Sequence, residues 1–173
     1  MKKLLVLVLL LAALAVPSLA AAHPLGNFTV NRHATIELSA GDVYVRYALD
    51  LAEIPAFQLG AEVRRPGFAR ELARNLELGL DGERAPLVLL ERRVVARPGA
   101  GGLKTLRLDA VFRAEGTGGR LSFRDRSFPR RIGWREIVVH AGRGARVVSA
   151  SVPQASTSDG LRSYPSELSR SLG

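Results

Sequence analysis

The sequence of 173 residues contains no cysteine, and lysine is almost absent after the first three residues. Without cysteine, the chain forms no disulfide and offers no thiolate to a metal ion. It also lacks a second long apolar run after residues 4–16, and this run is shorter than the roughly 20 apolar residues that a membrane helix needs. The rest of the chain is therefore predicted to fold without crossing a membrane itself.

The first residues have the order of a secretory signal peptide. Two lysines precede the apolar run, and the small-residue segment at residues 19–22 follows it. A charged start, an apolar core and an A-x-A cleavage site are typical of such signals. Cleavage after Ala22 would make His23 the first residue of the mature chain, whereas cleavage after Ala20 would leave two alanines in front of it. We expect residues 1–22 to be a signal peptide and the mature protein to be extracytoplasmic, either periplasmic or on the cell surface.

The chain is basic, with 25 lysine and arginine residues against 16 acidic ones and a formal net charge of +9. Such a charge raises nucleic acid as a partner, but export separates the protein from nucleic acid. The densest basic stretch is residues 120–136, where Phe123, Phe128 and Trp134 alternate with arginines. The spacing favours aromatic side chains in the core and arginines on a solvated face, and an anionic membrane surface is the alternative partner.

The sequence after the signal peptide alternates between apolar and polar residues with a period of two, which is typical of strands. In residues 28–38 the even positions are apolar except for Arg32, and the alternation resumes in residues 43–51 after a turn. Pairing Leu38 with Val43 keeps both apolar sets on one face, and a slip by one residue would destroy this match. These residues predict an antiparallel hairpin with one buried face.

The remaining sequence predicts a mainly β protein. Residues 66–76 begin with proline and place apolar side chains at i, i+4 and i+8, which predicts one short helix. Further strands are predicted over residues 85–96, 103–115, 120–124, 134–140 and 145–152. Several short strands with one inserted helix favour an Ig-like β-sandwich over residues 23–152, with a small barrel as the alternative. Residues 153–173 are polar and rich in serine, and we predict a linker or tail there.

The predicted hairpin brings candidate metal ligands to its polar face. Its register pairs His33 with Ala48 and Asn31 with Asp50, so that His33 is diagonal to Asp50. Diagonal neighbours lie about 7–8 Å apart, within reach of long side chains. The other interpretation is a solvated histidine and an ordinary hydrogen bond between Asn31 and Asp50, since the sequence has no HExxH motif and no paired-histidine spacing.

A free amino group on His23 would form a chelate with its own imidazole ring. Pro24 has no backbone N–H, so binding through amide nitrogens cannot extend past this position. Further ligands would come from elsewhere, and Glu53 and His140 are candidates besides His33 and Asp50. Imidazole and carboxylate groups suit Ni(II) or Co(II), with Cu(II) or Zn(II) as alternatives.

Four stretches of the sequence resemble one family. They are HPLGNFTVNRHATIEL at residues 23–38, YALDLAEIPAFQ at 47–58, FRDRSFPRRIGWREIVV at 123–139 and LRSYPSEL at 161–168. Together they resemble the extracytoplasmic N-terminal region of the nickel/cobalt exporter-like membrane proteins, which are often labelled high-affinity nickel transporters. The most specific markers are HPLGNFTVN and RIGWREI.

The resemblance implies a place outside the cytoplasmic membrane, next to a metal transporter. In that family the region precedes a bundle of membrane helices that performs transport, and this sequence contains no such bundle. We therefore expect either the N-terminal part of a longer protein or a domain that acts with a separate membrane transporter domain. The expected role is a non-enzymatic accessory domain that receives or buffers metal at His23, His33 and Asp50.

Two other functions remain open from the residues. The first is a structural or partner-docking module without metal binding. The second is a copper enzyme that uses an amino-terminal histidine chelate, as oxidative polysaccharide-cleaving proteins do. No second histidine is clearly placed to complete such a copper site, so this function ranks last.

Overall fold

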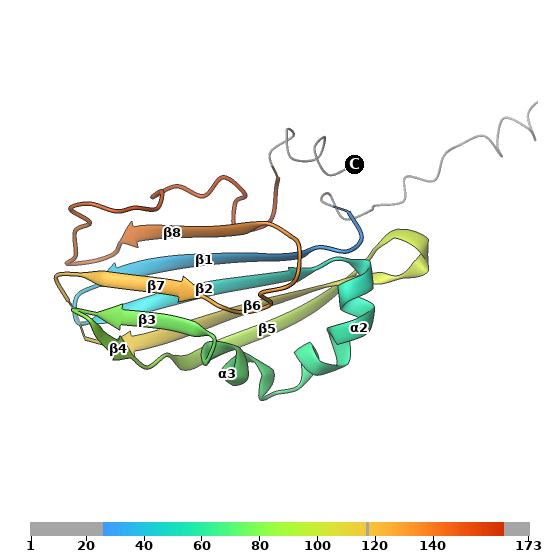
Figure 1. Ribbon diagram of the computed structural model, residues 1–173, viewed down its shortest axis with the longest axis horizontal. Helices are drawn as coiled ribbons and strands as arrows, with labels where there is room; N and C mark the ends of the chain where they lie inside the picture. The colour runs from blue at the N-terminus through green and yellow to red at the C-terminus, as the bar shows by residue number, and fades with distance from the viewer. Residues whose placement is uncertain (1–25, 117, 165–173) are drawn as a thin grey trace, which may run out of the picture.

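The computed structural model describes residues 26–116 and 118–164, which form two β-sheets packed face to face (Figure 1). The predicted signal peptide and His23 lie outside the described residues. The protein is mainly β with few helices, which confirms the predicted class and is consistent with a β-sandwich. No helix within residues 26–116 and 118–164 is long and apolar enough to span a bilayer.

The larger sheet has five strands in the order β5-β6-β2-β1-β8. All its neighbouring strands are antiparallel except β1 and β8, which run parallel. A short 3₁₀ turn, η1 (Ala100–Gly102), joins β5 to β6. The strands are β1 (Val30–Ser39), β2 (Asp42–Leu51), β5 (Val88–Pro98), β6 (Lys104–Glu115) and β8 (Arg135–Ala141).

The smaller sheet has three strands in the order β4-β3-β7, all antiparallel. It covers one face of the larger sheet, and the apolar side chains of both sheets form the core between them. The strands are β3 (Leu76–Leu80), β4 (Glu83–Ala85) and β7 (Leu121–Asp125). The other face of the larger sheet, called the outer face below, carries the polar residues of the alternating pattern.

The register of the β1–β2 hairpin is as predicted. Leu38 pairs with Val43, His33 with Ala48 and Asn31 with Asp50. The period-two pattern was sufficient to predict this register, because only this register buries the apolar residues of both strands together.

The core contains one cluster of polar side chains around Arg32. This residue breaks the apolar pattern of β1, yet its side chain points into the core and is only 1% exposed. Its Nε lies 3.8 Å from an oxygen of Asp125, at the end of β7. The hydroxyl of Tyr47 donates to the same carboxylate at 2.9 Å and lies 2.8 Å from the hydroxyl of Ser127. The cluster therefore ties the two sheets together inside an otherwise apolar core.

The helices differ in part from the prediction. The helix predicted over residues 66–76 is present as α3 (Phe68–Ala73), but β3 already begins at Leu76. A longer helix, α2 (Glu53–Arg64), precedes it and was not predicted, because a proline within a segment ordinarily interrupts a helix. Pro55 is the third residue of α2, where its missing N–H would have no acceptor within the helix. The two helices pack against β6 and β5 respectively.

The chain after β8 also differs from the prediction. The strand predicted over residues 145–152 does not form. The chain returns beside β8, where the N–H of Val139 donates to the carbonyl oxygen of Pro153 at 3.1 Å. The next residues, 153–164, cross the outer face, and we call them the strap. Ser158 and Leu161 of the strap are buried although they belong to the predicted polar linker or tail.

Candidate functional site

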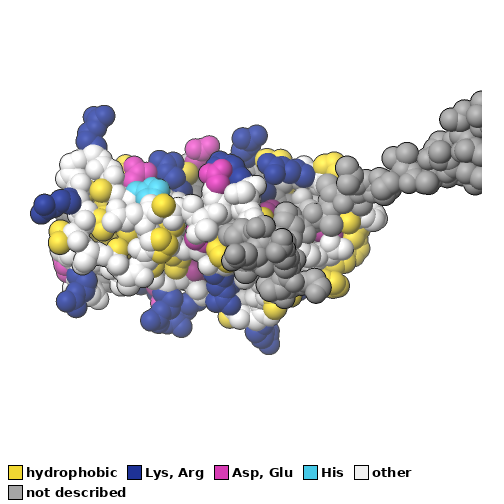
Figure 2. Space-filling view, turned by 90° about the horizontal axis from the view of Figure 1, so that it is seen from above, with side chains coloured by type: hydrophobic (Ala, Val, Ile, Leu, Met, Phe, Trp, Pro, Cys, Tyr) yellow, Lys and Arg dark blue, Asp and Glu magenta, His cyan; other side chains and the backbone are white. Residues whose placement is uncertain are grey.

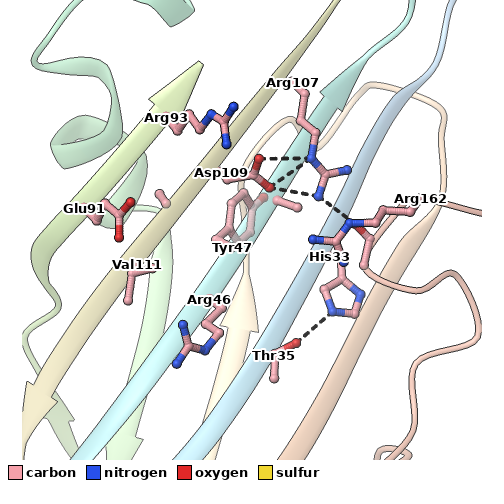
Figure 3. Close-up of a pocket in the computed structure, with 13 residues that line it drawn as sticks. His33, Thr35, Arg46, Tyr47, Glu91, Arg93, Arg107, Asp109, Val111 and Arg162 are labelled. Atoms are coloured by element: carbon pink, nitrogen blue, oxygen red, sulfur yellow. Dashed lines mark hydrogen bonds and ion pairs between the residues drawn. The ribbon is translucent and has the colours of Figure 1, made fainter. Parts of the chain in front are cut away.

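The outer face contains a hollow of about 360 Å³ that is lined by arginines (Figure 3). Its centre is Ala48 on β2, which pairs with His33 on one side and with Asp109 on the other. Strands β1, β2, β5 and β6 and the strap all contribute to its walls. We call this site the arginine hollow, and its main residues are His33, Thr35, Arg46, Ala48, Arg93, Arg107, Asp109 and Arg162.

His33 is buried at the edge of the hollow, and both of its ring nitrogens have partners. Nδ1 lies 3.2 Å from Oε2 of Glu136, and Nε2 lies 2.9 Å from the hydroxyl of Thr35. Burial lowers the pKa of His33 more than the neighbouring Glu136 raises it, so the ring is neutral near pH 7. Because an ionised carboxylate only accepts hydrogen bonds, Nδ1 carries the proton and Nε2 accepts the hydroxyl of Thr35.

The carboxylate of Glu136 holds the strap on the sheet. Burial alone would raise the pKa of Glu136, but hydrogen bonds to its charged form lower this pKa to about 2. The group is therefore ionised over the whole physiological range. Besides His33, its donors are the indole N–H of Trp134, the hydroxyl of Ser156, the backbone N–H of Thr157, and the backbone N–H and hydroxyl of Ser158.

Arg107 on β6 fixes the other part of the strap. Its Nε donates to Asp109 at 2.9 Å, and its two terminal nitrogens donate to the carbonyl oxygens of Leu161 and Gly160 at 3.3 and 2.8 Å. Hydrogen bonds from a charged donor such as this guanidinium group are stronger than those between neutral groups. The strap is thus held on the sheet by the carboxylate of Glu136 on β8 and by the guanidinium group of Arg107 on β6.

The structure keeps His33 diagonal to Asp50, as predicted, and gives several of the predicted metal ligands partners within the protein. Asp50 lies on the outer face, but it accepts a hydrogen bond from the hydroxyl of Tyr164 at 3.3 Å. Glu53 is fully buried and accepts the N–H of Ala100 at 2.8 Å. His140 pairs in register with Glu37 on β1. Within residues 26–116 and 118–164, no three histidine, aspartate or glutamate side chains form a group that could hold a metal ion.

Several residues of the site were not singled out from the sequence. The alternation of β6 would have placed Arg107 and Asp109 on the polar face, since Leu106 and Leu108 are apolar and buried. β8 gave no such signal for Glu136, because Arg135 and Glu136 are both charged and residues 137–139 are all apolar. The strap gave no such signal, because its contacts use serine hydroxyls and backbone groups that follow no period.

Comparisons with known proteins identify no relative. No protein-family model matches the chain, and neither does any curated protein or solved structure. The proposed function therefore depends on the geometry above and on the resemblance of the four sequence stretches.

Proposed function

We propose that this protein is a non-enzymatic, extracytoplasmic accessory domain of a nickel/cobalt exporter-like transport system. Residues 1–22 would export it, and the Ig-like sandwich would dock on a membrane transporter domain, in the same longer chain or in a separate protein. The observation that supports this proposal is that the four stretches with the family resemblance meet at one end of the larger sheet.

The first and third stretches are in direct contact. The N–H of Val30 donates to the carbonyl oxygen of Ile132 at 2.9 Å, and the side-chain oxygen of Asn31 accepts the N–H of Trp134 at 2.8 Å. Gly133 packs so closely that a Cβ atom there would lie 2.3 Å from the oxygen of Val30. Only glycine fits this contact, so residues 26–31 of the first stretch and the RIGWREI motif form one joint.

The other two stretches adjoin the same joint. The N–H of Ile54 donates to the carbonyl oxygen of Asn27 at 3.0 Å, which brings the start of α2 beside the first stretch. Tyr164, in the fourth stretch, donates to Asp50 in the second. The described residues of the four stretches thus form one continuous structural unit, as expected if they share a role.

This end of the sandwich also exposes large apolar side chains. Phe28, Phe57 and Ile132 are 64%, 79% and 67% exposed. The segments of Phe57 and Ile132 are neighbours, because Arg131 donates to the side-chain oxygen of Gln58 at 3.0 Å. On the face that Figure 2 shows, basic side chains lie at separate points rather than in one patch. Neighbouring exposed apolar residues are typical of a docking surface, and we assign this one to the transporter domain.

Deletion of the gene tests this function in cells that produce the protein. We expect the deletion strain to contain more nickel and cobalt and to grow less well at high concentrations of either metal, and the wild-type gene should restore both properties. Unchanged metal content and growth in the deletion strain would contradict the proposed function.

Paired variants test the docking surface in the same strain. F57S/I132S should fail to restore metal content, because truncating two interface anchors should weaken docking at least about thirtyfold. L90S/V148S removes two other exposed apolar side chains and should restore it. Equal protein levels, measured by immunoblot, are required for the comparison. Full restoration by F57S/I132S would exclude this surface as the docking site.

A second candidate function is the receipt of a divalent metal by His33. Histidines that bind metals usually donate their other ring N–H to a carboxylate, and Nδ1 of His33 contacts Glu136 in this way. Nε2 faces Thr35 beside the hollow, and a metal would displace this hydroxyl. His23 and Asp50 would have to complete the ligand set.

Calorimetry with Ni(II), Co(II), Cu(II) and Zn(II) tests this second function on the purified, exported chain. If His33 is a ligand, binding should be tighter than millimolar and should be lost in H33Q but not in the control H140Q. An additional alanine in front of His23 should weaken binding if the terminal amine contributes. Binding weaker than millimolar for all four metals would exclude the metal role.

A further inference from the structure

The arginine hollow owes its shape to one small side chain. Ala48 lies between His33 and Asp109 in register. Figure 3 shows longer side chains from the four strands around the hollow. The hollow's volume of about 360 Å³ is within the range of sites that bind small molecules. It is therefore large enough for a compact ligand of a few carbon atoms.

The charges that line the hollow favour an anion. Four arginines line it against two carboxylates, those of Glu91 and Asp109. The charge of Asp109 is compensated, because Arg107 contacts it through both Nε and a terminal nitrogen. The remaining positive charge of the lining would therefore attract an anion.

Two of the four arginines are already occupied. Arg107 donates to Asp109 and to the two strap carbonyls described above. Arg46 donates through Nε and a terminal nitrogen to one oxygen of Glu37, at 3.2 and 3.1 Å. These two residues build the walls of the hollow rather than bind a ligand.

The other two arginines, Arg93 and Arg162, have guanidinium N–H groups that are available to a ligand. The side chain of Arg93 on β5 makes no hydrogen bond or ion pair within the described residues, although its backbone pairs with Asp109 in the sheet. The side chain of Arg162 on the strap contacts only Asp159 within the described residues, with an exposed ion pair at 3.7 Å and a long hydrogen bond to its carbonyl oxygen. Figure 3 shows the two guanidinium groups on opposite sides of the hollow. Such a pair fits a ligand with an anionic group at each end.

We propose that the arginine hollow binds a small organic dianion with two carboxylates, one held by Arg93 and the other by Arg162. A guanidinium group binds a carboxylate through two parallel hydrogen bonds, which gives both strength and direction. The hydroxyl of Thr35 donates its hydrogen bond to His33, so its oxygen can accept a hydrogen bond from a ligand. The carboxylate of Glu91 is a second acceptor that lines the hollow. These acceptors favour a dicarboxylate that also carries a hydroxyl group. The site stands independently of the proposed role in transport.

Isothermal titration of the purified, exported chain at constant ionic strength tests the site, with malate as the hydroxydicarboxylate and succinate as the dicarboxylate without hydroxyl. We expect saturable binding of malate and weaker binding of succinate. A48L fills the hollow without changing the charge and should abolish binding. R93Q and R162Q should each weaken it at least about tenfold. R70Q removes the same charge from an exposed position on α3 and should bind like the wild type.

Four outcomes would overturn the site. They are the absence of saturable binding to the wild type, unchanged binding to A48L, equal losses in R70Q and R93Q, and displacement of malate by phosphate and chloride at similar concentrations. The last result would mean an adventitious ion only. If circular dichroism shows that A48L does not fold, R93Q still decides the question, because the exposed side chain of Arg93 is bonded to no described residue and its replacement should leave the fold intact.

Discussion

Replacement of Asp125 by alanine should lower the free energy of unfolding by about 3–5 kcal/mol. The reason is that Arg32 is buried in the core, 3.8 Å from Asp125, and a guanidinium group stays protonated in proteins. Without the carboxylate, the core would contain an uncompensated positive charge. The hydroxyl of Tyr47 would also lose an acceptor. Since domains of this size are stable by about 5–15 kcal/mol, such a loss would leave a large fraction of the protein unfolded on mild heating.

Urea unfolding measures this effect, and D159A is the matched control. Asp159 forms an exposed ion pair with Arg162, so D159A should cost less than about 1 kcal/mol. Replacement of Arg32 by leucine in the D125A background should recover part of the loss, because it removes the buried charge. Equal costs for D125A and D159A would mean that the core contains no such ion pair.

The protein should also lose stability as the pH falls, in two steps. The pKa of His33 is lowered by burial, so the unfolded chain takes up its proton first and stability begins to fall below about pH 6.5. The pKa of Glu136 is about 2 in the folded protein against 4.5 ordinarily. Its contribution of roughly 3 kcal/mol is present above pH 4.5 and is lost as the pH falls towards 2.

The variant E136Q should remove the second step. At pH 7 its free energy of unfolding should be about 2–4 kcal/mol lower, because a neutral amide accepts the strap's donors less well than a carboxylate. Between pH 4.5 and 2 its stability should then change much less than that of the wild type. Cleavage by trypsin after Arg162 should become faster, since the strap loses its main anchor. Glu115, which is 83% exposed, gives a control, E115Q, and an acid profile of E136Q that equals the wild-type profile would contradict this assignment.

The sequence predicted the fold where one physical pattern dominated. The period-two alternation of β1 and β2 determined their register because burial of the apolar face leaves no other pairing. The pattern did not predict α2, because Pro55 near its start suggested that no helix forms there. It wrongly predicted a strand over residues 145–152, which instead form an irregular segment that runs back beside β8. Arg32 was seen only as an exception in its strand, because the partner that explains it, Asp125, lies on another sheet.

The candidate site was predictable only within the hairpin. The register placed His33 beside Ala48, but the pairing of Ala48 with Asp109 depends on how β6 joins the sheet, which is not determined by local pattern. The environment of His33 depends on Glu136, about one hundred residues away. Long-range pairing of this kind is set by the whole fold, so a short stretch of sequence carries no signal for it.

The parallel pairing of β1 with β8 has a consequence for the speed of folding. His33 and Glu136 are separated by 103 residues, and the strands they belong to cannot pair until most of the chain has been ordered. Contacts between distant residues slow folding, because the entropy of closing the loop is lost before the contacts form. The part of the outer face that the strap covers would thus be among the last to form. A partner or protease that meets the newly made chain would therefore have access to this part of the outer face.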